Sequence, residues 1–406
     1  MKILLSAFAC EPGKGSEFEV GWNWTIGLAE FGHDITVLTR SISKPAVEKA
    51  LGALPAGMEK PRFVYVDLAP AFRWEKRGPL HLHHIVWQHC AARFAQRLNA
   101  VDRFDCVHHV TYAGLRSPSF MGRLGIPFIF GPVGGGEVAP WRLRVGYTLH
   151  GLVFDALRDL ANLAVRLEPA IAQTFARATR VYVTSSETLR LVPPCYRQKA
   201  AVELAIGSDE RKLQPVSAKP LRRSPDMPFR VLYAGRFVDY KGMHLGIRAF
   251  AKLSAAQPTA HLTLIGSGPA EAHWRRLANN LGIASRIRWL PWQRQQDMTT
   301  FYPEHDVLLF PTLHESGGLV VLEAMNHGLP VVCLKLGGPG VLVDDSCGRA
   351  IDVAGKSRTQ VIAELADALS ELADFGARSA LFNGAHTRCR EFSWQKKVQR
   401  IYGFAS

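Results

Sequence analysis

Short apolar runs alternate with longer amphipathic segments along the whole chain, which has 406 residues. This alternation is typical of βαβ units, in which helices connect buried parallel strands. In the first half, the apolar runs predict strands at residues 2–9, 34–39, 62–68, 105–110, 126–131 and 180–185. In the second half, they predict strands at residues 229–235, 260–266, 286–291, 306–311, 329–334 and 348–353. Beyond residue 355 the pattern is helical and predicts two or three helices.

The two sets of strands are separated by residues 207–228, which are rich in Pro, Ser, Lys and Arg and poor in apolar residues. We interpret this segment as a linker between an N-terminal Rossmann-like domain at residues 1–206 and a second one at residues 229–385. A C-terminal helix within residues 386–406 is expected to pack back on the first domain. In doubly wound sheets, ligands bind at the carboxyl ends of the strands. Two such domains in series therefore predict a site in a cleft between them.

The composition is that of a globular protein, with 47% hydrophobic and 21% charged residues. No stretch approaches the roughly 18 consecutive apolar residues of a membrane-spanning helix. The opening MKILLSAFAC predicts a buried strand and not a signal peptide, so we expect a cytoplasmic protein. The seven cysteines form no close pair, which argues against a disulfide framework. The formal charge of +14 indicates an anionic partner, which could be a nucleic acid, a phosphorylated substrate or a membrane face.

Two cations follow the predicted strand at residues 229–235. Arg236 and Lys241 lie on what reads as a strand-to-helix turn. A planar guanidinium and a compact ammonium together suit the two phosphates of a diphosphate. The alternative is a pair of ordinary surface cations near a helix start. Because a cation there opposes the helix dipole, we favour phosphate binding.

The segment HESGGLVVLEAM carries the strongest candidate site. Gly317 and Gly318 open a predicted helix, whose bare N–H groups can bind a phosphate. Glu315 on the loop and Glu323 on the helix can accept hydrogen bonds from vicinal sugar hydroxyls. The alternative, a glutamate that only caps a helix, would explain Glu315 or Glu323 taken singly. It does not explain the two glutamates together with Arg236 and Lys241. Gly266 in LIGSGP allows another close backbone approach, although a plain tight turn explains it nearly as well.

The motifs GRFVDYKG, LIGSGP and PTLHESGGLVVLEAMNHGLPVV resemble the nucleotide-sugar site of family-4 retaining glycosyltransferases, which have the GT-B fold. The pattern Glu-x7-Glu is the hallmark of that family, and the resemblance runs over nearly the whole chain. It implies an α/β protein with two Rossmann-like, doubly wound domains that face an interdomain cleft. It also implies that Arg236 and Lys241 hold the diphosphate, Glu323 the ribose hydroxyls and Glu315 the hydroxyls of the donor sugar.

The same resemblance implies that the backbone of Gly318 and Leu319 completes the phosphate and sugar cradle. The sequence departs from the family pattern at two places. Gly317 stands where an aromatic residue is frequent, and Pro339 follows the glycine pair where an acidic residue is usual. Both departures lie in the sugar or phosphate pocket that the resemblance implies.

In the first half, the loop CEPGKGSEFEV follows the first strand. The resemblance makes Gly15 and Ser16 candidates for donor binding. A dinucleotide-binding fingerprint is not met. Phe18 stands at the position of its third glycine, and Arg40 stands where an acidic residue would end the second strand.

His108 and His109 end the predicted strand at residues 105–110. Because side chains alternate along a strand, only one of them can face a transferred sugar. We favour His109 as the catalytic histidine that the resemblance implies, the alternative being a core histidine without a role. His108, Gly135 and Glu137 are candidates for contact with the acceptor or for a glycine loop over the site, although a surface turn explains that loop equally well.

The histidine-rich stretch HLHHIVWQH has no acidic or cysteine co-ligand nearby, so we expect no metal site. This stretch and residues 140–167 are instead basic and amphipathic. Two interpretations remain open for such helices. The apolar face can dip into anionic lipid with the cations at the headgroups, or it can pack on a sheet.

The function that the resemblance implies is that of a hexosyltransferase with a UDP-sugar as favoured donor and GDP-mannose next. The expected acceptor is a lipid-linked or polysaccharide hydroxyl in bacterial surface glycan synthesis, and the expected location is the cytoplasm, at the inner face of the membrane. No cofactor or metal is expected, because protein cations stabilise the leaving diphosphate. The alternatives are a retaining glycosidase, a sugar-nucleotide epimerase of the same fold and a non-catalytic anion-binding module. A nucleic-acid-binding module is disfavoured because no recognised motif is present.

Overall fold

A computed structural model describes residues 1–69, 80–210, 213 and 227–403. The chain divides into two compact units, each built from segments that are separated in the sequence. Unit 1 consists of Met1–Gly136, Leu160–Ile206 and Trp394–Ser406, and unit 2 of Glu137–Asp159 and Gly207–Ser393.

Two segments group differently from the predicted domain boundaries. Glu137–Asp159 belongs to unit 2, and residues 386–393 do as well. The helix that begins at Trp394 belongs to unit 1. Most of the predicted linker, residues 211–212 and 214–226, lies outside the described residues.

The described residues of unit 1 form a sheet of seven parallel strands in the order β3-β2-β1-β4-β5-β6-β7. The strands are β1 (Lys2–Ser6), β2 (Asp34–Thr39), β3 (Arg62–Tyr65), β4 (Cys106–His109), β5 (Phe128–Val133), β6 (Arg180–Val183) and β7 (Ala200–Val202). The helices are α1 (Ser16–Glu30), α2 (Lys44–Gly52), α3 (Leu80–Asp102), α5 (Pro169–Arg177), α6 (Ser186–Leu191) and α14 (Trp394–Tyr402). Helix α4 (Leu149–Ala164) begins in unit 2 and ends in unit 1.

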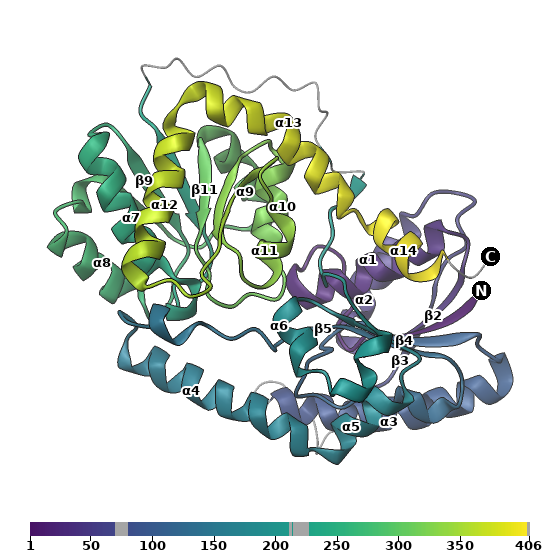
Figure 1. The fold of residues 1–406 in the computed structure, drawn as a ribbon. Coiled ribbons are helices and arrows are strands. Elements are labelled where there is room, and N and C mark those ends of the chain that lie inside the picture. The colour runs from purple at the N-terminus through teal and green to yellow at the C-terminus, as the bar shows by residue number, and fades with distance from the viewer. Residues whose placement is uncertain (70–79, 211–212, 214–226, 404–406) are drawn as a thin grey trace. The chain divides into compact units, whose positions relative to one another are not determined.

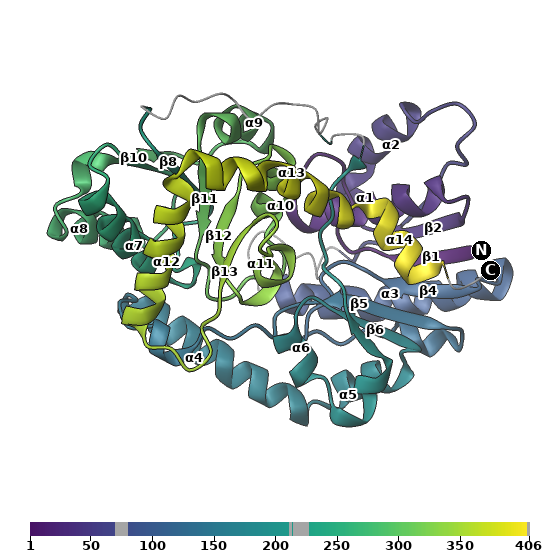
Figure 2. The same cartoon turned by 45° about the horizontal axis from the view of Figure 1, so that its top comes forward.

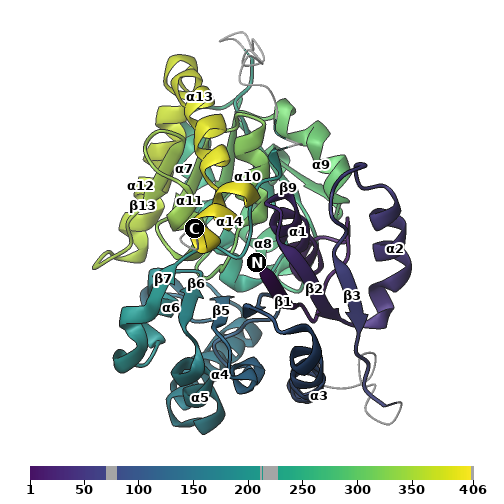
Figure 3. The ribbon, with the colours of Figure 1, turned by 90° about the vertical axis from the view of Figure 1, so that its right-hand side faces the viewer.

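Both faces of the unit 1 sheet are buried, which explains why its strands read as continuous apolar runs. Ile3 and Leu5 of β1 belong to one apolar cluster with side chains of α1 and α14. Leu4 between them points to the other face, where it clusters with Trp87 of α3 and Phe175 of α5. Figure 3 shows α1 and α14 on one face of this sheet and α3 on the other.

A buried ionic cluster attaches α14 to the segment after β7. The ammonium of Lys397 is fully buried and lies 2.9 Å from Glu203 Oε1. Arg400 Nε lies 2.8 Å from Glu203 Oε2. Burial by itself would raise the pKa of Glu203, but the two cations outweigh it and hold this pKa below its usual value. Glu203 is therefore an ionised carboxylate that is neutralised from both sides.

In unit 2, the part of the chain that the structure describes forms a sheet of six parallel strands in the order β10-β9-β8-β11-β12-β13. The strands are β8 (Arg230–Ala234), β9 (His261–Ile265), β10 (Ile287–Leu290), β11 (Val307–Phe310), β12 (Val331–Leu334) and β13 (Gly348–Ile351). The helices are α7 (Met243–Ala256), α8 (Glu271–Asn280), α9 (Gln295–Phe301), α10 (Leu319–Asn326), α11 (Gly337–Leu342), α12 (Arg358–Ala373) and α13 (Phe375–Glu391). Helix α12 packs beside α7 and α13 beside α10 (Figures 1 and 2).

Local sequence signals mark several helix starts in unit 2. Ser357 and Gln360 form a capping box at the start of α12, in which each side chain accepts from the other residue's backbone N–H. The carboxylate of Asp374 accepts from the N–H of Ala377 at the start of α13. These caps satisfy N–H groups that the helix itself leaves unpaired.

The predicted α/β fold class is confirmed, and each predicted strand corresponds to an observed one. The strand β7 was not predicted, because Ala200–Val202 is short and lies at the edge of the sheet, where it is partly exposed. Between residue 355 and residue 403, where the described part of the chain ends, the structure has three helices, α12 to α14. Among the described residues, no helix is both long and apolar enough to cross a membrane.

Candidate active site

The loops after β8 and β11 lie at the same edge of the unit 2 sheet. β8 pairs with β9 on one side and with β11 on the other, so the chain order of the strands reverses between β8 and β11. In open parallel sheets, ligands bind outside the carboxyl ends of the strands at such a switch point. The loop after β8 carries Arg236 and Lys241, and the loop after β11 carries Glu315.

Lys241 and Glu315 form an ion pair between these two loops. Lys241 ends the 3-10 turn Asp239–Lys241 (η8), and Gly242 after it has a φ of 71°. A Cβ on Gly242 would lie 1.9 Å from the carbonyl oxygen of Pro311. Only glycine therefore lets the two loops approach this closely, and this approach brings the ammonium to the carboxylate.

The guanidinium of Arg236 is exposed, and no ion pair joins it to the described part of the chain. The loop that carries it packs closely on the loop after β9. A Cβ on Gly266 would lie 2.0 Å from the carbonyl oxygen of Gly235, and one on Gly268 would lie 2.3 Å from that of Phe237. Both glycines are thus needed for loop packing, which leaves the Arg236 side chain at the surface.

Gly318 is the N-cap residue of α10, and Leu319 is the first residue of that helix. The φ of Gly318 is 95°, a conformation that residues with a Cβ rarely adopt. No side chain caps this helix start. The first N–H groups of α10 are therefore not satisfied by a capping side chain, as the glycine pair Gly317–Gly318 predicted.

A second glycine pair, Gly337–Gly338 at the start of α11, supports the backbone of the Glu315 loop. The N–H of Gly338 donates to the carbonyl oxygen of Glu315 at 2.7 Å. A Cβ on Gly338 would lie 2.1 Å from the carbonyl oxygen of Gly317. In the sequence this pair stands out only as part of a family motif, whereas the structure gives it this packing role.

Glu323 lies on α10 and accepts two hydrogen bonds. The hydroxyl of Tyr302 donates to Oε2 at 2.6 Å, and the Nε2 amide of Gln295 donates to Oε1 at 2.6 Å. Burial raises the pKa of Tyr302 well above its ordinary value, so its hydroxyl stays protonated and able to donate. Neither partner was predicted, because they lie on and just after α9 and no spacing in the sequence links them to Glu323.

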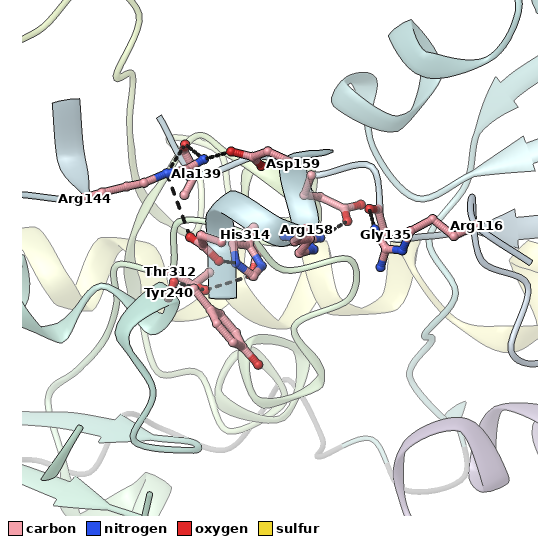
Figure 4. Close-up of polar contacts among 11 residues, drawn as sticks. Arg116, Gly135, Ala139, Arg144, Arg158, Asp159, Tyr240, Thr312 and His314 are labelled. Carbon is pink, nitrogen blue, oxygen red and sulfur yellow. Dashed lines mark hydrogen bonds and ion pairs between the residues drawn. The ribbon is translucent and has the colours of Figure 1, made fainter. Parts of the chain in front are cut away.

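A buried polar cluster holds the residue before Glu315 (Figure 4). His314 Nε2 lies 3.0 Å from Asp155 Oδ1, and the His314 ring stacks on Tyr240 at a centroid distance of 4.1 Å. Burial lowers the pKa of His314, and the hydrogen bond to Asp155 opposes this shift only in part. His314 is therefore a neutral imidazole that donates to the carboxylate. Arg144 lies on the other side of Asp155 at 3.9 Å.

The residue after Glu315 is held in a similar way by Glu137. Ser316 Oγ donates to Glu137 Oε2 at 2.7 Å, and Arg158 lies 3.8 Å from the same carboxylate. Glu137 is almost fully buried. The structure thus places this predicted acceptor or lid residue within unit 2, against the loop that carries Glu315.

We predict that Asp155 positions Glu315 through His314. Asp155→Ala is expected to lower kcat by about tenfold, which corresponds to about 1.4 kcal/mol of transition-state stabilisation. Asp155→Asn keeps an oxygen acceptor for His314 and is expected to stay within about threefold of wild type. Steady-state kinetics of both variants check the prediction, together with their melting temperatures. Equal loss of stability in both variants with an unchanged kcat would show that Asp155 acts only in packing.

In unit 1, the predicted donor residues Gly15 and Ser16 lie at the start of α1. Gly15 is the N-cap residue with a φ of 71°, and Ser16 is the first helical residue. The carboxylate of the next residue, Glu17, accepts from the backbone N–H of Tyr112 at 2.8 Å. This bond joins the first turn of α1 to the loop after β4, and β1 and β4 flank the switch point of the unit 1 sheet. The contact of Gly15 and Ser16 with a donor stays a prediction.

His108 and His109 point to opposite faces of the unit 1 sheet, and both are fully buried. His108 contacts Tyr402 of α14 through Nδ1 at 2.6 Å, and burial lowers its pKa to about 3. His109 Nε2 donates to the carbonyl oxygen of Thr111 at 3.0 Å, and burial lowers its pKa to about 4. Both imidazoles are therefore neutral at physiological pH, and the preference for His109 stays a prediction.

Gly135, the third candidate of the acceptor loop, has a φ of 94°, and its carbonyl oxygen accepts from Arg116 Nη1 at 3.2 Å. The histidines of the predicted cluster lie on α3, where the side chains of His83 and His84 are buried. Within the described residues, no group of three or more His, Cys, Asp or Glu side chains is arranged to hold a metal ion.

Comparison with known proteins agrees with this geometry. The family model described as "Glycosyl transferases group 1" matches residues 219–373, the segment that holds the loops after β8 and β11. This match covers less than half of the chain. The two parallel sheets match GT-B glycosyltransferase structures, and these findings support the resemblance to family-4 glycosyltransferases that the sequence indicated.

Two relatives illustrate the extent of similarity. D-inositol 3-phosphate glycosyltransferase 2 of Catenulispora acidiphila is 28% identical over 86% of this chain and 81% of that protein. The D-inositol 3-phosphate glycosyltransferase of Acidothermus cellulolyticus is 28% identical over 60% of this chain, and the match spans only 54% of that protein.

Among solved structures, the Anabaena protein Alr3699/HepE in complex with UDP is similar to this chain with a TM-score of 0.61 and 15% identity. The similarity covers 100% of this chain and 99% of that one. At this identity the similarity concerns the fold alone.

Proposed function

We propose that this protein is a glycosyltransferase that moves a hexose-type sugar from a nucleoside diphosphate to an acceptor hydroxyl, with retention of the α configuration. A UDP-sugar is the favoured donor and GDP-mannose the next. The observation that carries the proposal is the pairing of Lys241 with Glu315 at the switch point of the unit 2 sheet, beside the start of α10. The UDP in the Anabaena structure supports the choice of nucleotide.

The charges at this edge suit the departure of a diphosphate. As the bond between the sugar C1 and the phosphate oxygen breaks, negative charge grows on the diphosphate and positive charge on the sugar ring. Lys241, Arg236 and the first N–H groups of α10 supply positive charge for the diphosphate. Because the protein provides these cations, we propose a reaction that needs no metal ion.

The two glutamates have different partners and, in this proposal, different roles. Glu323 already accepts from Tyr302 and Gln295, which fix the carboxylate in one orientation. We assign it to the ribose hydroxyls. Glu315 is placed by its neighbours His314 and Ser316, and we assign it to the hydroxyls of the transferred sugar. A new bond from the acceptor oxygen to C1 completes the transfer, and the acceptor proton passes to the leaving phosphate oxygen.

For the acceptor, we propose a lipid-linked or polysaccharide hydroxyl in the assembly of a bacterial surface glycan. The supporting observation is the formal charge of +14, which favours an anionic lipid carrier or an anionic membrane close to the acceptor. In this proposal the enzyme works at the cytoplasmic face of the membrane.

Thermal unfolding in the presence of UDP-, GDP- and ADP-sugars tests the donor. A ligand that binds only the folded state at about 100 times its Kd adds about 2.7 kcal/mol to the free energy of unfolding. We expect a UDP-sugar to raise the melting temperature most, and Lys241→Ala to remove most of that rise. The proposal is wrong if no nucleotide sugar raises the melting temperature, or if the rise is unchanged in Lys241→Ala.

A further inference from the structure

Helix α4 has an unusual orientation, because its apolar side chains face outward. Leu149 is 78% exposed and Leu157 is 63% exposed, and Val153 between them is also exposed. These residues recur every four positions, so they share one face of the helix. Later in the same helix, Leu160 and Leu163 are exposed as well.

The charged side chains of α4, those of Asp155, Arg158 and Asp159, have partners within unit 2. Asp155 is only 2% exposed and accepts a hydrogen bond from His314. Asp159 Oδ2 accepts from Arg144 Nη2 at 2.6 Å, and Arg158 lies beside Glu137. The helix is therefore attached to unit 2 through ion pairs and hydrogen bonds. Its apolar face takes no part in this attachment.

Exposure of this kind has a cost in water, since each large apolar side chain that stays exposed forgoes the free energy of burial. A contiguous set of such side chains marks a surface that binds another apolar phase. Trp141 in the preceding 3-10 turn, Trp141–Leu143 (η4), is also 70% exposed. Tryptophan is favoured where apolar lipid meets water.

The charges near the apolar face of α4 indicate what kind of surface it binds. Between Trp141 and Leu160 the sequence has two carboxylates, Asp155 and Asp159, and Arg144 lies beside both. Arg142 next to Trp141 is exposed. The whole chain carries a formal charge of +14, so two copies of it repel each other while an anionic surface attracts it.

We propose that the outward face of α4, together with Trp141, docks on an anionic lipid surface. The helix then lies in the plane of the interface with Leu149, Val153 and Leu157 among the acyl chains, while its buried polar face stays attached to unit 2. This inference deepens the proposed location at the membrane by naming the surface that binds the lipid, and it does not depend on the sugar-transfer chemistry.

Co-sedimentation of the full chain with lipid vesicles tests the proposal. The probes are vesicles of phosphatidylcholine alone and vesicles that also contain phosphatidylglycerol. We expect the wild type to bind the anionic vesicles, and to bind the neutral ones far more weakly. The triple variant Leu149→Ser, Val153→Ser, Leu157→Ser is expected to lose at least about tenfold in partition to the anionic vesicles, because binding scales with the apolar area that enters the lipid.

A matched control carries three serines at exposed apolar positions outside α4, namely Phe31, Ile42 and Val101. It is expected to bind like the wild type. The donor-dependent rise in melting temperature, measured on the α4 variant, reports on the sugar-transfer site separately and is expected to be unchanged. Equal vesicle binding by the wild type and the α4 variant would overturn the proposal. The proposal would also be overturned if the wild type bound no vesicles and formed a dimer while the α4 variant was a monomer. A second copy of the chain would then cover this face.

Discussion

Replacing Lys241 with alanine is expected to lower kcat by about 10²–10³-fold, the range found when one preorganised group that stabilises transition-state charge is removed. The ammonium lies at the switch point through its ion pair with Glu315, so it needs no reorganisation when the diphosphate departs. Glu315→Gln is expected to cause a loss of similar size, because it removes the charge that holds Lys241 and an acceptor for sugar hydroxyls. Steady-state transfer from a UDP-sugar gives kcat and KM for each variant.

The double variant tests whether the two residues act as a unit. Because they contact each other, its loss should be much smaller than the sum of the two single losses on a free-energy scale. Lys252→Ala, which removes an exposed lysine of α7, is the charge-matched control and should leave kcat unchanged. A Lys241→Ala enzyme with near-wild-type kcat would refute the assignment of this lysine to the leaving diphosphate.

Replacing Glu203 with alanine is expected to lower the free energy of unfolding by about 3–5 kcal/mol, the cost of leaving a buried charge without its partner. The change strands the fully buried ammonium of Lys397 and releases α14 from the segment after β7. Scanning calorimetry or urea unfolding measures the loss. Glu48→Ala removes the exposed pair with Lys44 on α2 and is the matched control, expected to cost at most about 0.5 kcal/mol.

The effect of Glu203 should also depend on pH. The folded protein holds the pKa of Glu203 below its unfolded value of about 4.3. The contribution of Glu203 to the free energy of unfolding is therefore complete at pH values above its unfolded pKa. This contribution is lost as the pH falls through the pKa of Glu203 in the folded protein. The difference in the free energy of unfolding between wild type and Glu203→Ala should therefore become smaller in acid.

The double variant Glu203→Leu, Lys397→Met should recover most of the stability at neutral pH, since an apolar pair can replace a buried ion pair. A loss below about 1 kcal/mol in Glu203→Ala would identify the cluster as no stronger than a surface pair.

The strands were predictable because each central strand is buried on both faces. Val231, Leu232 and Tyr233 of β8 are all fully buried, so the sequence there is apolar without interruption. A signal of this kind depends only on local sequence. β7 lacks it, since an edge strand with exposed residues carries no continuous apolar run.

The loops that form the candidate site were predictable for a related reason. In a parallel sheet, the residues that follow each strand come to the same edge, so Arg236, Lys241 and Glu315 could be expected near each other from their place after β8 and β11. Their polar partners could not be predicted. Asp155 lies 159 residues before His314 in the chain, and no periodicity or motif links the two.

What the sequence by itself determined was the order of strands and helices, the glycine-rich turns and the amphipathic character of residues 140–167. Only the tertiary structure decided that the segment Glu137–Asp159 joins unit 2, and that α4 turns its polar face inward. The physical reason is that hydrophobic periodicity shows which residues share a face but not what that face meets. The ion pairs of Arg144 with Asp155 and Asp159, together with the bond from His314, decided that question through long-range contacts.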